Sequence, residues 1–79
     1  MEIKVLGTGC AKCQELYEKV TELNSEMGIA ADVKKVEKVE EIIAAGIMIT
    51  PALLINGRIK AVGKVPNKDT LKRYIEEEL

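Results

Sequence analysis

Residues Gly7-Thr8-Gly9-Cys10-Ala11-Lys12-Cys13 contain both cysteines of the chain and follow a short apolar run at residues 2–6. The two glycines are expected to turn the backbone, so a strand would end before this segment and a helix would begin within it. Residues three apart on a helix share one face, which brings the sulfurs of Cys10 and Cys13 within bonding distance. The segment therefore predicts a redox-active Cys-x-x-Cys pair at the start of a helix.

The two thiols are expected to differ. Cys10 falls at or next to the helix N-cap, where free backbone N–H groups and the helix dipole favour a thiolate, and Lys12 adds a nearby cation. Cys13 lies one turn deeper, in line with the apolar positions Leu16 and Val20. We therefore predict that Cys10 is the nucleophile, that Lys12 helps to stabilise its thiolate, and that Cys13 is the shielded, resolving cysteine.

The composition limits the fold and the partners. We expect residues 1–79 to form one domain, and its core must be aliphatic because the chain has no Phe and no Trp. Twelve basic and 13 acidic residues give a net charge of -1, which does not indicate a nucleic acid or an anionic membrane as partner. We find no secretory signal pattern, and the apolar run at residues 42–49 is too short to cross a bilayer. A cytoplasmic protein is the expectation, and there a lone Cys-x-x-Cys indicates redox or metal chemistry.

Hydrophobic periodicity and turn residues predict seven elements. We expect strands at residues 2–6, 29–36, 52–55 and 58–62, and helices at residues 11–27, from 38 to the stop at Gly46, and from the cap at Asn67 onward. The dipeptide Asn56-Gly57 predicts a tight hairpin between the last two strands. Glu76 to Glu78 place negative charge at the end of the last helix, so we expect its final turn to fray.

This order, β-α-β-α-β-β-α, together with Cys10-Ala11-Lys12-Cys13 and the Thr50-Pro51 step, resembles the small archaeal and bacterial thioredoxin-like proteins called redox-active disulfide proteins. The resemblance implies an α/β fold, a three-layer sandwich around a four-stranded mixed sheet. It also implies that Pro51 is cis and packs against the disulfide, that Thr50 offers its backbone to a substrate peptide, and that Gly63 forms the opposite wall. Residues Ile47, Met48 and Ile49 would then form an apolar docking rim.

Some features of larger relatives are missing. Thioredoxins usually have Trp before the first cysteine and Gly-Pro between the pair, where this chain has Gly9 and Ala11-Lys12. The buried carboxylate of thioredoxins has no counterpart in residues 3–6. Of the glycines that cradle glutathione in glutaredoxins only Gly63 is present, so glutathione use is not supported.

The resemblance implies a thiol–disulfide oxidoreductase that transfers electrons to protein disulfides. Its redox group would be the Cys10–Cys13 disulfide itself, without a further cofactor and without a metal, and its partners would be protein disulfide substrates and an unidentified reductase. We expect a monomer. The charged cluster formed by Lys34, Lys35 and Lys38 with Glu37 and Glu40 is interpreted as a solvated surface.

A soft-metal carrier is the alternative. A Cys-x-x-Cys pair between a first strand and a first helix also resembles the Cu(I) site of small metal chaperones, in which two thiolates hold the ion. Those domains have the order β-α-β-β-α-β and usually have Met where this chain has Thr8. The element order thus separates the two hypotheses.

Overall fold

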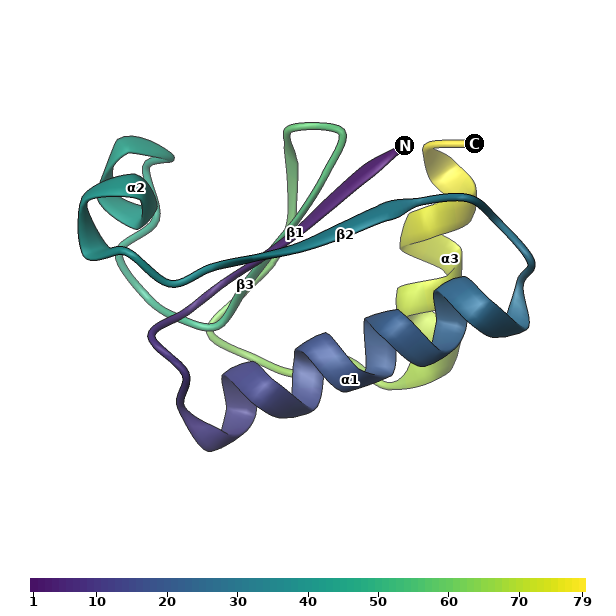
Figure 1. The fold of residues 1–79 in the computed structure, drawn as a ribbon, viewed down its shortest axis with the longest axis horizontal. Coiled ribbons are helices and arrows are strands. Elements are labelled where there is room, and N and C mark those ends of the chain that lie inside the picture. The colour runs from purple at the N-terminus through teal and green to yellow at the C-terminus, as the bar shows by residue number, and fades with distance from the viewer.

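The computed structural model describes all 79 residues and has the predicted order of elements (Figure 1). None of its helices combines the length and apolar character that a bilayer crossing requires. The elements are β1 (Glu2–Leu6), α1 (Ala11–Glu26), β2 (Asp32–Val36), α2 (Val39–Ala44), β3 (Ala52–Ile55), β4 (Arg58–Val62) and α3 (Lys68–Glu77).

The four strands form one mixed sheet in the order β2-β1-β3-β4. Strand β2 is parallel to β1, whereas β3 is antiparallel to both β1 and β4. Helices α1 and α3 lie on one side of the sheet, and the short α2 lies at the far end of the molecule, over the other face (Figure 1). The predicted three-layer α/β sandwich is therefore confirmed.

Each face of the sheet has its own core because side chains alternate along a strand. The larger cluster joins the sheet to α1 and α3, and its members are Ile3, Val5, Leu16, Val20, Leu23, Leu53, Ile55, Ala61, Leu71 and Ile75. The smaller cluster joins the sheet to α2, and its members are Leu6, Ile42, Ile47, Ala52 and Leu54. The apolar face predicted for α1 is thus the face that holds this helix, and with it both cysteines, against the sheet.

Strand β2 begins at Asp32, three residues later than the sequence predicts. The side chain of Asn24 donates to Ala31 O at 3.2 Å and accepts from Ala31 N at 3.3 Å. These backbone groups are satisfied by a helix side chain instead of a neighbouring strand, so the ladder starts after them. The predicted hairpin is confirmed, with positive φ at both Asn56 (52°) and Gly57 (80°), as a type I′ turn requires.

The expectation of a frayed last turn in α3 is wrong. Lys60 has no partner across the sheet, because Leu53 pairs with Ala61 and Leu54 with Ile59. Its Nζ lies 3.1 Å from Glu77 Oε1 and 2.9 Å from Glu78 Oε2. Lys60 is the extra residue of a β-bulge in β4, and its ammonium group thus neutralises negative charge at the C-terminal end of α3.

The ion pair of Glu78 predicts a pH-dependent contribution to stability. The hydrogen bond from Lys60 lowers the Glu78 pKa below its ordinary value of 4.5. A lowered carboxyl pKa stabilises the fold above the ordinary value, and this gain is lost as the pH falls through the folded-state pKa. We expect Glu78→Gln to lower the midpoint of urea unfolding at pH 7 and to have little effect at pH 3. Glu76→Gln, which removes an exposed carboxylate without an ion pair, should be neutral at both values; equal effects of the two variants would contradict this prediction.

Candidate active site

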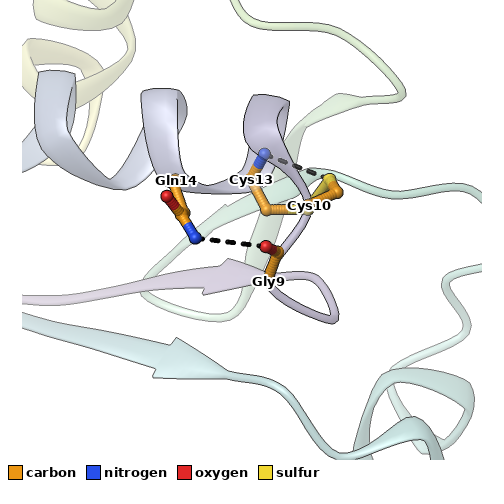
Figure 2. The surroundings of a disulfide bond; sticks show 4 residues. All are labelled: Gly9, Cys10, Cys13 and Gln14. Carbon is orange, nitrogen blue, oxygen red and sulfur yellow. Dashed lines mark hydrogen bonds between the residues drawn. A yellow bond between two sulfur atoms is a disulfide. The ribbon is translucent and has the colours of Figure 1, made fainter.

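The two cysteines are joined as a disulfide at the N-terminal end of α1 (Figure 2). Cys10 is the N-cap residue, with extended backbone (φ −67°, ψ 166°), and its Sγ accepts a hydrogen bond from Cys13 N at 3.2 Å. The Cys10 side chain is exposed, whereas Cys13 is only 5% exposed. The predicted asymmetry in access is confirmed: an incoming sulfur can reach Cys10 directly and cannot reach Cys13.

Gly9 shapes the loop that precedes the disulfide. Its φ of +91° lies in the region that disfavours residues with a side chain. Its carbonyl oxygen accepts a hydrogen bond from Gln14 Nε2 at 3.2 Å, which links the loop back to the second turn of α1 (Figure 2). Lys12 is exposed on the same helix and forms no ion pair, so its predicted effect on the Cys10 thiolate stays a prediction.

Gly7 lies between the disulfide and the Thr50-Pro51 step. A Cβ placed on Gly7 would overlap Cys13 Sγ, would lie 2.9 Å from Cys13 Cβ, and would lie 3.8 Å from Thr50 Cβ. Cys13 and Thr50 therefore lie close to one another, on two sides of the same glycine. The Thr50–Pro51 peptide bond is cis, and Pro51 is fully buried.

The close approach at Gly7 predicts that a side chain there is costly. Gly7→Ala forces the end of β1 away from Cys13, and overpacking of this kind costs about 1–3 kcal/mol in the free energy of unfolding. The measurement is urea unfolding of the oxidised protein. Gly7 has no positive φ, so the loss of stability in Gly7→Ala should come from the contact with Cys13; Gly46→Ala gives the separate cost of a left-handed backbone, since Gly46 has φ +80° and a Cβ placed on it would meet no atom within 4 Å. A Gly7→Ala protein as stable as the parent would show that Cys13 moves freely away from the strand.

Gly63 and Ile49 meet at the other side of the site. A Cβ on Gly63 would lie 2.9 Å from Ile49 Cγ2, and the φ of Gly63 is +74°, so only glycine fits there without a shift. Met48 and Ile49 are 89% and 61% exposed, as a docking rim requires. Ile47 is 3% exposed and belongs to the smaller core cluster, so the prediction that it forms part of an exposed rim is wrong, although it lines the base of the neighbouring groove. The reason is that its side chain packs with Ile42 beneath α2.

An apolar groove extends from the disulfide loop to α2. Its lining residues are Thr8, Val39, Ile42, Ile43, Ile47, Met48 and Thr50. Val39 and Ile43, which the sequence analysis assigned only to the second helix, are 53% and 61% exposed. Their exposure shows that α2 directs part of its apolar surface to solvent beside Thr8 and Thr50.

A second, smaller hollow lies against Cys13, and we call it the Cys13 pocket. Its volume is about 30 Å³, and its lining includes Gly7, Gly9, Cys13, Gln14, Lys35 and Glu37. Lys35 and Glu37 are exposed, which confirms the interpretation of a solvated surface, and both also border this hollow. Because β1 and β2 are parallel, their carboxyl ends meet at one edge of the sheet. The predicted parallel pairing could therefore have placed Glu37, which follows β2, near the cysteine loop, which follows β1.

The chain has no buried charged side chain, so no buried carboxylate lies beneath the disulfide. The metal-carrier hypothesis is not supported, because the chain ends in a hairpin and a helix and not in the strand order of the metal chaperones. No group of three or more His, Cys, Asp and Glu side chains is arranged to hold a metal ion.

Comparisons with known proteins agree with this geometry. A family model described as a thioredoxin domain matches residues 1–76. A thioredoxin of Methanothermobacter thermautotrophicus is 36% identical over 75 residues, which cover 95% of this chain and 97% of the relative. A thioredoxin of Methanocaldococcus jannaschii is 40% identical over 78 residues, with 94% and 90% coverage. A probable thioredoxin of Methanothermobacter marburgensis is 34% identical over 73 residues, with 89% and 85% coverage.

Proposed function

The chain belongs to the thioredoxin family, whose members are thiol–disulfide oxidoreductases, and on that premise we propose that it reduces disulfide bonds of other proteins through Cys10 and Cys13. The observation that supports this most strongly is the disulfide itself, which joins an exposed N-cap cysteine to a buried one. Such an arrangement separates the sulfur that attacks from the sulfur that resolves.

The reaction has two exchange steps. The Cys10 thiolate attacks one sulfur of the substrate disulfide, forming a mixed disulfide and releasing the other substrate sulfur as a thiolate. Cys13 then attacks Cys10 Sγ, which releases the second substrate sulfur and forms the Cys10–Cys13 disulfide. The protein is oxidised by two electrons and the substrate is reduced by two. A reductase or another dithiol must return the pair to its reduced form, and no cofactor beyond the cysteines is needed.

The substrate would lie beside the disulfide as an extended segment. Thr50 is near Cys13, and its backbone groups would pair with a strand-like peptide. Ile49 and Gly63, which are in contact, would border that peptide together with the buried Pro51. The apolar groove toward α2 is continuous with Thr8 and Thr50, so it would receive an apolar side chain of the substrate next to its reactive cysteine.

The test is reduction of insulin with dithiothreitol as the electron donor. The rate is measured as the increase in turbidity when the reduced insulin chain precipitates. We expect the protein to accelerate precipitation well above the rate with dithiothreitol alone. Protein whose thiols are first reduced and alkylated is the control and should give the background rate. No acceleration by the reduced protein would refute the proposed function.

A further inference from the structure

The Cys13 pocket connects a buried sulfur to charged groups at the surface. Of the four hollows in the chain, it is the one that Cys13 lines. Its volume of about 30 Å³ is sufficient for one water molecule, which needs roughly 10–15 Å³ of such space. Polar partners for that water are available in the amide of Gln14, the carboxylate of Glu37 and the ammonium group of Lys35.

Two charged side chains from the end of β2 face this pocket. Glu37 lies over the disulfide loop, since its Oε2 is 3.3 Å from the position of a Cβ on Gly9. Lys35 is held by the ring of Tyr17, whose centroid is 4.5 Å from Lys35 Nζ. The carboxylate thus lies beside the disulfide loop and the ammonium group beside α1, and both residues line the same hollow as Cys13.

Few other titratable groups surround the pocket. Cys10, bonded to Cys13, and Tyr17, in contact with Lys35, lie nearby without lining it, and Lys38, Glu40 and Glu41 follow Glu37 along the chain toward α2. Val5 is the one residue of β1 that lines the pocket, whereas the titratable Glu2 and Lys4 of that strand do not, and the loop from Gly7 to Gly9 has no titratable side chain. Among the lining residues, Glu37 is the only one with a carboxylate, the side-chain group there that can accept a proton from a thiol.

We propose that Glu37 accepts the proton that Cys13 loses when it resolves the mixed disulfide, through one water molecule in the Cys13 pocket. An apolar site disfavours a thiolate, and Cys13 is only 5% exposed to bulk solvent, so its proton needs a path out. This inference rests on the proposed function, because it concerns the second exchange step.

The step balances in atoms and charge. The Cys13 thiol gives its proton to the pocket water, which passes one of its own to Glu37. The sulfur attacks Cys10 Sγ, a bond forms between the two cysteines, and the bond from Cys10 to the substrate breaks. The electron pair leaves on the substrate sulfur as a thiolate. Glu37 then releases its proton to solvent, and Lys35 provides a positive charge near the transient Cys13 thiolate.

The test uses the reduced protein and the aromatic disulfide dithiobis(nitrobenzoate) in stopped flow. The first coloured thiolate is released by the attack of Cys10 and the second by the attack of Cys13. We expect Glu37→Gln to slow the second release about 100-fold at pH 7, the low end of general-base effects, and to leave the first release unchanged. The difference between the two proteins should shrink as the pH rises, because a thiol that ionises at high pH no longer needs a base. Glu37→Asp should recover part of the rate.

Glu40→Gln is the matched control, because it removes an exposed carboxylate three residues away that does not line the pocket. It should leave both releases at the parent rates. An unchanged second release in Glu37→Gln, or an equal change of both releases, would overturn the proposal, since the latter indicates a general effect of charge on Cys10. If the parent protein gives no second release, the proposed function fails, and that result is distinct from either of these.

Discussion

Cys10→Ser is expected to reduce the insulin-reduction rate by about 1,000-fold or more, to the background of dithiothreitol alone. The hydroxyl that replaces the thiol is not ionised at neutral pH and cannot exchange with a disulfide, so the first step has no nucleophile. The buried Cys13 cannot substitute for it, because it is 5% exposed and lies behind the N-cap. The measurement is turbidity under the conditions used for the parent protein.

Cys13→Ser is the matched variant, and its expected failure is different. Cys10 remains exposed at the N-cap and attacks the substrate, but nothing resolves the product. Mixed disulfides with the substrate should accumulate and be visible by mass spectrometry without reductant, whereas Cys10→Ser should form none. Because the disulfide closes a loop of only four residues, its loss should destabilise both variants little and to the same degree. If mixed disulfides accumulated in Cys10→Ser and not in Cys13→Ser, Cys13 would be the nucleophile and Cys10 the resolving cysteine.

Local signals were sufficient for most of the fold. The hairpin follows from Asn56-Gly57, where two successive positive φ angles are needed, and β3 follows from a short apolar run that both cores bury. The start of β2 and the end of α3 depend instead on side-chain contacts between elements, from Asn24 to Ala31 in one case and from Lys60 to Glu78 in the other. Hydrophobic periodicity and turn residues contain no information about such contacts.

The same distinction applies to the site. The Cys10-x-x-Cys13 pair and its asymmetry are local, because they follow from the position of each sulfur on one helix. The burial of Ile47 and the placement of Glu37 beside Cys13 are set by how α2 and β2 pack against the rest of the chain. A pattern of alternating Lys and Glu indicates exposure, but it does not show which of the exposed charges lies next to a functional group.

Leu53→Ala is expected to destabilise the protein more than any surface change, by about 3–5 kcal/mol in the free energy of unfolding. Leu53 is 0% exposed and belongs to the cluster that holds α1, and thus the disulfide, against the sheet. A stability of about 0.05–0.15 kcal/mol per residue gives a domain of this size roughly 4–12 kcal/mol in total. The substitution should therefore remove about a quarter or more of this stability, as measured by urea titration and circular dichroism.

Leu54→Ala is the matched control, since it removes the same atoms from the next residue of β3 on the opposite face. Leu54 is 8% exposed, its cluster has five buried members, and it borders an open groove between the sheet and α2. The loss should be about 2 kcal/mol, because solvent and neighbouring side chains can fill the space left by the leucine. The difference in unfolding free energy between the two variants measures how much more the sheet face covered by α1 and α3 contributes to stability than the face covered by α2. Equal losses would show that the short α2 covers its face of the sheet as tightly as the two longer helices cover theirs.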